Sequence, residues 1–177
     1  LVQLEKDEEI VACFDEVKDD TLVFFTALGS AKSTEGKEFD LRTKKTAAIA
    51  LKDVDRVIAV EKQDDTAGTV IMVSKGGMSI RFATDTVPVM GKGAGGVKCM
   101  KLDEGDRVIF AAQIADEGEI LTISDRGYAK RSLVFDYEIQ GRNGKGRRTF
   151  DVEKNGSDGT ALAAAPYGPA PPGLCGR

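Results

Sequence analysis

The chain has 177 residues and a net charge of −4, with 41% apolar and 31% charged residues. This composition is typical of a folded globular protein, and no apolar run is long enough to span a membrane. The chain has no histidine, so it lacks the commonest general base and the usual zinc ligand. Its three cysteines, at 13, 99 and 175, fit neither a metal site nor a disulfide framework. We therefore expect no metal and no cofactor, and the alternative of an enzyme that uses carboxylates or lysines stays open.

The chain opens with an acidic stretch that precedes a short apolar run, LEKDEEIVA from Leu4. It lacks the basic region of a signal peptide, so we expect a cytoplasmic protein without membrane contact. The same pattern returns as LKDVDRVIAV from Leu51 and as LDEGDRVIFA from Leu102. The three starts are 47 and 51 residues apart, and each apolar run predicts a short strand after a turn.

A second set of similar segments follows the same period. These segments are TLVFFTALGSAKS from Thr21, TVIMVSKGGMSIR from Thr69 and EILTISDRGYAKR from Glu119. In each, an apolar run predicts a strand, a glycine predicts a tight turn, and a second strand then begins. The turn glycines, at the same position in each segment, are Gly29, Gly77 and Gly127.

These repeats predict the domain organisation. Residues 1–17 would end one blade, and residues 18–66, 67–117 and 118–165 would form three more. TALAAA, near the end of the last repeat, is predicted as a strand because its position in the repeat outweighs the helix preference of alanine. Residues 166–177 are rich in proline and glycine, which indicates a disordered tail or a foreign remnant. We expect an all-β fold of β-propeller blades with about four strands each, either part of a larger ring or an open array.

Two glycine-rich loops are the main candidates for a binding site. Gly91 and Gly141 each lie fourteen residues after a turn glycine, and Gly96 and Gly146 lie nineteen after. The first loop fits G-x-G-x-x-G but precedes no predicted helix, which argues against a dinucleotide site. Residues 140–148, QGRNGKGRR, combine four cations with glycines that let backbone N–H groups approach a phosphate. The alternative is a solvated, flexible loop.

Cations also follow the turn glycines. Lys32 occupies the position of Lys130, and Arg81 occupies the position of Arg131. If blades surround an axis, these side chains would share one rim and form a track for a phosphate backbone; the alternative is an ordinary exposed strand face. Aromatic residues make up only 6% of the chain. This favours a duplex over a single strand, and contacts to the backbone over contacts to bases.

Three segments, from Leu22, Ile80 and Ile120, resemble blades of the C-terminal domain of bacterial type IIA topoisomerase A subunits, which belong to DNA gyrase and topoisomerase IV. The resemblance spans residues 1–165 and implies a β-pinwheel, a ring of usually six blades that bends duplex DNA around its basic rim. The family's gyrase box has the form Q-[KR]-R-G-G-[KR]-G, and residues 140–146 read QGRNGKG. Gly141 and Asn143 depart from it, and no tyrosine follows an arginine as the family's cleavage tyrosine does.

The sequence thus predicts a non-catalytic, DNA-binding and DNA-bending domain without sequence specificity, within a bacterial, nucleoid-associated topoisomerase that controls supercoiling. Its expected partners are double-stranded DNA, the ATPase B subunit, and the rest of the topoisomerase chain. The alternative is a propeller that binds proteins and not DNA. The residues expected to contact DNA are Lys32, Arg81, Lys92, Lys98, Lys130, Arg131, Gln140, Arg142, Gly144, Lys145, Gly146, Arg147 and Arg148.

Overall fold

The computed structural model describes residues 4–6, 8–40, 45–52, 54–151 and 161–167, the last of these as backbone only. The strands in chain order are β1 (Thr21–Thr26), β2 (Ser30–Glu35), β3 (Val57–Lys62), β4 (Thr69–Ser74), β5 (Met78–Ala83), β6 (Val97–Lys98), β7 (Val108–Ile114), β8 (Glu119–Ser124), β9 (Ala129–Leu133), β10 (Arg147–Arg148) and β11 (Ala161–Tyr167). Three short 3₁₀ turns accompany them: η1 (Gly36–Phe39), η2 (Thr84–Thr86) and η3 (Val134–Asp136). The predicted all-β fold is confirmed.

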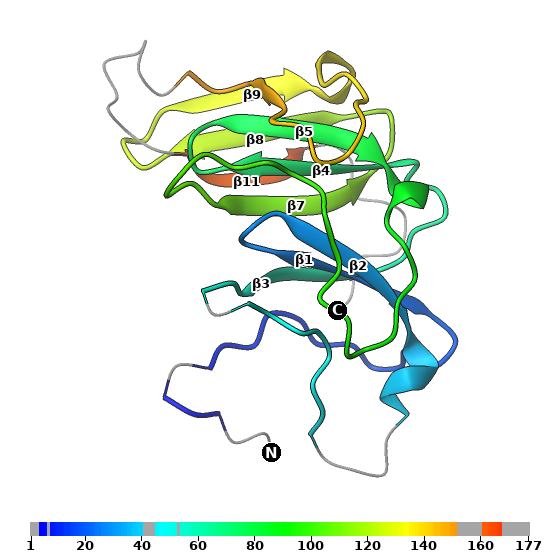
Figure 1. Cartoon of the computed structure of the whole chain (residues 1–177). Coiled ribbons are helices and arrows are strands. Elements are labelled where there is room, and N and C mark those ends of the chain that lie inside the picture. The colour runs from blue at the N-terminus through cyan, green and yellow to red at the C-terminus, as the bar shows by residue number, and fades with distance from the viewer. Residues whose placement is uncertain (1–3, 7, 41–44, 53, 152–160, 168–177) are drawn as a thin grey trace, which may run out of the picture.

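The strands form three antiparallel sheets, and Figure 1 shows the first of them below the other two, which overlap in this view. Their orders are β3-β1-β2-β6, β10-β5-β4-β7 and β11-β8-β9. Each hairpin turns at one of the predicted glycines, and Gly29, Gly77 and Gly127 all have φ near +80°, which only glycine adopts without strain. β11 confirms the strand predicted at TALAAA and extends two residues past 165.

The second and third repeats each add a short strand to the sheet of the preceding repeat. β6 belongs to the second repeat but pairs with β2 of the first, where Lys98 lies opposite Ser30. β10 of the third repeat pairs in the same way with β5, and Arg147 lies opposite Ser79. The sheets therefore do not coincide with the sequence repeats, because the second and third repeats each give three strands to one sheet and a short strand to the sheet before it.

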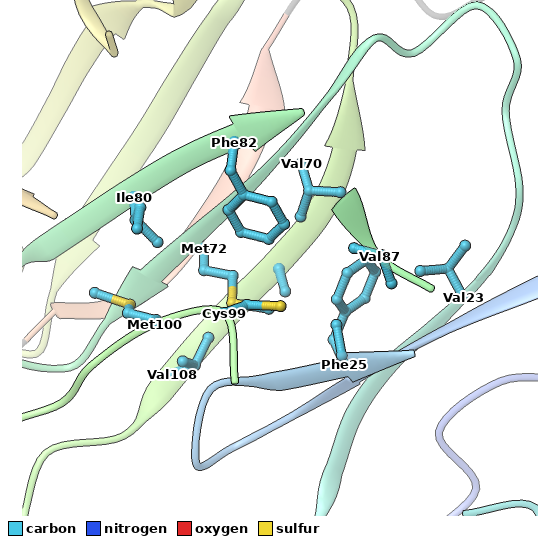
Figure 2. Close-up of a cluster of buried hydrophobic side chains, with 12 residues drawn as sticks. Val23, Phe25, Val70, Met72, Ile80, Phe82, Val87, Cys99, Met100 and Val108 are labelled. Atoms are coloured by element: carbon cyan, nitrogen blue, oxygen red, sulfur yellow. The ribbon is translucent and has the colours of Figure 1, made fainter. Parts of the chain in front are cut away.

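Two hydrophobic clusters hold the sheets together, and β4 contributes to both. Val70 and Met72 face the first sheet, where they pack with Phe25, Phe82 and other buried side chains (Figure 2). Ile71 and Val73 face the third sheet instead. A strand that is buried on both faces carries an unbroken apolar run, which accounts for the TVIMV pattern.

Two predicted features differ from the structure or lie outside it. The apolar run at Ile10 and Val11 is not a strand, because no neighbouring strand pairs with it within the described residues. The tail beyond residue 167 and the link at 152–160 lie outside those residues. None of the described segments is a helix long and apolar enough to cross a membrane.

Candidate nucleic-acid interface

The two glycine loops lie directly on the preceding repeat. Gly96 and Gly146 have φ of +82° and +75°. A Cβ on Gly96 would lie 2.6 Å from the carbonyl oxygen of Ala31, and one on Gly146 would lie 2.1 Å from that of Ser79. No larger residue fits at either position without moving the backbone, so glycine is what allows the loop to cross β2 or β5 and to add β6 or β10 to its sheet.

The second glycine loop is also hydrogen-bonded to the segment that follows the first glycine loop. Arg142 Nη1 donates to the carbonyl oxygen of Lys98 at 3.3 Å. The backbone N–H of Asn143 donates to Cys99 O at 2.6 Å, and that of Lys101 donates to Gly144 O at 2.8 Å. These three bonds place the segment 98–101 beside the segment 142–144, so cations from two repeats lie along one continuous stretch of surface.

We call this stretch the cationic row and define it by its exposed side chains, Lys98, Lys101, Arg142, Lys145, Arg147 and Arg148. Lys145 Nζ lies 2.6 Å from Asp103, and Arg147 lies 2.6 Å from Glu138. Both pairs are exposed to solvent, and such pairs contribute only about 0–1 kcal/mol, so a phosphate can replace either carboxylate at low cost. The hydrogen bond from Lys145 also lowers the pKa of Asp103, which is therefore ionised at neutral pH.

Within the described residues, four members of the row have no salt-bridge partner: Lys98, Lys101, Arg142 and Arg148. Lys98 donates its Nζ to the carbonyl oxygen of Leu28 at 2.6 Å, which fixes the side chain without neutralising it. Lys101 was not predicted from the sequence. Its position directly after the buried Cys99 and Met100 could have identified it, because the chain leaves the core at that point.

Lys32 and Arg81, both predicted to contact DNA, are buried. Lys32 has no exposed surface, and its Nζ donates to the carbonyl oxygens of Gly91 and Lys92, each at 3.0 Å. Burial lowers the pKa of its ammonium group, against the opposing effect of the Glu38 carboxylate. The sequence pattern suggested a shared rim, but the next repeat covers these positions. The burial argues against DNA contact, and the cationic row leaves both residues out.

Arg81 is 4% exposed and is bonded on all sides. Its Nε donates to Thr69 Oγ1 at 2.9 Å, and its Nη1 donates to the carbonyl oxygens of Val134 and Tyr137 at 3.3 and 3.4 Å. Its Nη2 pairs with Asp116. The guanidinium group therefore joins the second repeat to the third, and four of its five N–H groups donate to protein acceptors.

The other predicted cations have intermediate positions. Lys92 is half-buried, and its backbone N–H and Nζ donate to the carboxylate and the carbonyl oxygen of Glu38 at 2.8 and 3.3 Å. Lys130 is exposed but donates to Thr149 O at 2.7 Å. Arg131 is exposed and pairs with Glu119 at 3.1 Å. These residues flank the row and do not belong to it.

Three predicted residues of the 140–146 segment shape the loop. Gln140 donates its backbone N–H to Arg81 O at 2.8 Å, and Gly144 lies against the Ile80 side chain. Gly146 provides the close crossing described above. Asn143, a departure from the gyrase box, has φ +68°, a left-handed conformation that asparagine adopts more readily than most residues. Asparagine can therefore take the place of the glycine of the gyrase box in this left-handed conformation.

No alternative chemistry competes with this surface among the described residues. They contain no cluster of potential metal ligands. Burial raises the pKa of the Cys99 thiol to about 11, so this thiol is neutral and unreactive at physiological pH. The loop at Gly91 leads into β6 and not into a helix, so it lacks the strand–loop–helix geometry of a dinucleotide site.

Comparison with known proteins gives one family. The family model of the DNA gyrase C-terminal domain, a β-propeller, matches residues 20–64, 68–115 and 118–157. The gyrase A protein of Escherichia coli K12 is 38% identical over 163 residues, which cover 88% of this chain and 18% of that protein. Its counterpart in Staphylococcus epidermidis is 36% identical, again over 88% of this chain and 18% of the relative. The chain thus spans about a fifth of these relatives.

Solved structures agree on the fold. A C-terminal domain of DNA topoisomerase IV aligns over 93% of this chain and 52% of its own, with a TM-score of 0.85 and 24% identity. A DNA gyrase A C-terminal domain aligns over 94% of this chain and 73% of its own, with a TM-score of 0.55 and 20% identity. The family match covers most of the described strands, and the chain belongs to the family of DNA gyrase C-terminal domains.

Proposed function

We propose that this chain binds duplex DNA through the phosphate backbone along the cationic row and bends it, as the accessory domain of a type II topoisomerase of the gyrase A type. The observation that carries the proposal is the bonding between segments 98–101 and 142–144, which turns the basic loops of two repeats into one surface. Lysine and arginine side chains on such a surface replace condensed counterions on DNA and do not need to read bases.

Several features support sequence-independent binding. The segments that carry the row, 98–101 and 142–148, contain no aromatic residue that could stack on a base, and the glycines of the second segment leave backbone close to the surface. The family membership supports the rest of the proposal: a non-catalytic role, the B subunit plus the remainder of the gyrase A protein as partners, and a place on the nucleoid in the bacterial cytoplasm.

The decisive experiment is a salt titration of binding to a fluorescent duplex. Six phosphate contacts predict a slope of log K against log salt of about −5. Changing Arg142, Lys145, Arg147 and Arg148 together to alanine would lower the affinity and bring the slope to about −2. A ring-closure assay on short linear DNA reports the bending separately, since bending raises the closure rate.

A matched control removes four exposed lysines of the acidic first part of the chain: Lys6, Lys18, Lys37 and Lys45. Its net charge equals that of the first variant, so a general effect of charge would weaken DNA binding equally in both. Equal loss of DNA affinity in the two variants would refute the cationic row as the binding surface. No retardation of a long duplex by the wild type at low salt would refute DNA binding and favour the alternative of a propeller that binds proteins.

A further inference from the structure

Two apolar side chains are exposed at matching positions of the second and third repeats. Val89 is 59% exposed and Ile139 is 57% exposed, and each lies twelve residues after the turn glycine of its repeat. The same offset in the first repeat holds Leu41, whose structure lies outside the described residues. One exposed apolar residue is ordinary on a protein surface, but Val89 and Ile139 repeat the exposure at one position of the fold. Neither belongs to the two hydrophobic clusters of the described residues.

The exposure of Val89 does not come from an end of the chain. Val89 belongs to the second repeat, which has a described repeat on either side. Ile139 lacks a following repeat among the described residues and is exposed to the same extent. A neighbouring repeat thus leaves this position open, and further repeats of a longer chain would leave Ile139 open as well.

Backbone bonds fix both positions on the sheet of the preceding repeat. The N–H of Ser33 donates to the carbonyl oxygen of the residue before Val89 at 3.0 Å, and the residue after Val89 donates to Ser33 O at 2.8 Å. Ile139 forms the same parallel bridge with Arg81, whose carbonyl oxygen accepts the N–H of the following residue at 2.8 Å. An exposed side chain on a fixed backbone loses little entropy on binding, which suits a contact with a ligand.

Each apolar side chain shares a sheet edge with a cation of the cationic row. Along β2, Lys98 and Val89 occupy positions three residues apart, and along β5 Arg148 and Ile139 do the same. Three residues of strand correspond to about 10 Å. Neither cation has a salt-bridge partner within the described residues. The same pair of a free cation and an apolar side chain therefore occurs twice along the surface.

Duplex DNA presents groups that match both members of the pair. Its phosphates attract the cation, and the minor groove that they border is about 6 Å wide, so a side chain about 10 Å from a bound phosphate can reach it. Aliphatic side chains in that groove press between base steps, unstack them in part and kink the duplex. A protein that covered Val89 and Ile139 would instead enclose the neighbouring cations, which is costly without matching carboxylates.

We propose that Val89 and Ile139 are wedges that enter the minor groove and set where the bound DNA kinks. This inference rests on the proposed function, since the cationic row must first hold the duplex. Phosphate contacts give affinity without reading sequence, whereas a wedge adds a preference for the steps that unstack most easily, TA and CA. Each repeat thus adds one kink to the curve of the duplex.

The variant V89S/I139S removes both wedges and leaves every cation in place. We expect it to bind a duplex with the salt slope of the wild type, because the phosphate contacts are unchanged. Its rate of ring closure on short linear DNA should fall by about fivefold or more. V89L/I139L keeps apolar side chains at both positions and should retain the closure rate of the wild type. Ring closure by V89S/I139S at the wild-type rate would overturn the proposal.

Unstacking is measured directly with 2-aminopurine, a fluorescent adenine analogue whose emission rises when it leaves the base stack. The probe is a duplex with this analogue at several TA steps. The wild type and V89L/I139L should raise the emission, and V89S/I139S should not. A wild type that binds this duplex without any rise in emission would also overturn the proposal.

A matched control changes two exposed apolar residues outside the cationic row, as L4S/V54S. We expect this control to bend and unstack DNA like the wild type, and an equal loss in it would assign the effect to surface polarity in general. Thermal melting of each variant shows that the fold is retained. The two proposals fail separately: a wild type that does not bind DNA refutes the proposed function, whereas intact binding with undiminished bending by V89S/I139S refutes the wedges alone.

Discussion

The Nζ of Lys32 lies 3.0 Å from the carbonyl oxygen of Gly91, fifty-nine residues further along the chain, and holds the first glycine loop against β2. Lys32→Met keeps the length of the side chain but removes its donors, which leaves the oxygens of Gly91 and Lys92 without this partner. We expect a loss of about 1–3 kcal/mol in the free energy of unfolding, measured by urea denaturation. Lys37→Met, at an exposed site, should change it by less than about 0.5 kcal/mol. Equal stability of the two variants would contradict the assigned role.

A second prediction concerns Gly146. Its Cβ position lies 2.1 Å from Ser79 O, and its φ is +75°, so Gly146→Ala combines a clash with backbone strain. We expect a destabilisation of about 2–4 kcal/mol together with weaker DNA binding, since β10 and its two arginines would shift. Gly141→Ala is the control, because nothing lies within 4 Å of that position. If both variants melt alike, the crossing does not depend on glycine.

The third prediction is a dependence on pH. Glu61 Oε2 accepts the backbone and side-chain N–H groups of Gln113 at 2.8 and 3.1 Å, which joins β3 to β7. Burial raises the pKa of Glu61 above its usual 4.5, although these hydrogen bonds oppose the shift. The protonated form is favoured in the folded state, so this contribution to stability is complete below pH 4.5 and is lost as the pH rises through the folded-state pKa.

Glu61→Gln should remove that dependence while keeping an oxygen for Gln113. Unfolding free energies measured from acidic to neutral pH would then rise less steeply toward acid for the variant than for the wild type. At neutral pH the variant should be at least as stable, because no charge is buried. The exposed variant Glu117→Gln serves as the control, and a pH profile unchanged by Glu61→Gln would exclude this residue as the source.

The fourth prediction concerns the buried Arg81. Arg81→Lys keeps the charge but cannot reach Thr69, Val134, Tyr137 and Asp116 at once, since an ammonium group lacks the planar fork of a guanidinium. We expect a loss of about 1–3 kcal/mol in unfolding free energy, because buried acceptors around Arg81 would lose their donors. Arg148→Lys, which is exposed on β10, should leave stability unchanged, and a comparable loss there would undermine the contrast between a structural and a surface arginine.

Local patterns predicted the strands well because each hairpin is built from residues close together in sequence. TVIMV, the turn at Gly77 and the strand that follows are all visible in the printed chain. The position of TALAAA in the repeat correctly outweighed the helix preference of alanine. Patterns within one repeat therefore indicate the type of each element and the position of its turn.

The pairing of a short strand with the sheet of the preceding repeat was not predicted. It explains why Lys32 and Arg81, expected on the surface, are buried. Lys32 and Arg81 look like surface charges in a strand, and only the three-dimensional contact with the next repeat shows that their polar groups are covered. Burial of this kind depends on which strand lies opposite another many residues away. The glycines at 96 and 146 could have indicated this, since a glycine at the same position in the second and third repeats marks a close backbone crossing.

The pairing of β6 and β10 with the preceding sheets also has a consequence for folding during synthesis. Ser30 pairs with Lys98 and Ser79 pairs with Arg147, so each of these contacts forms only after 68 further residues have been synthesised. Until then, β2 or β5 is an unpaired edge, which is the state most prone to wrong pairing. The repeats of this fold therefore cannot mature one at a time, and synthesis of each repeat finishes the one before it.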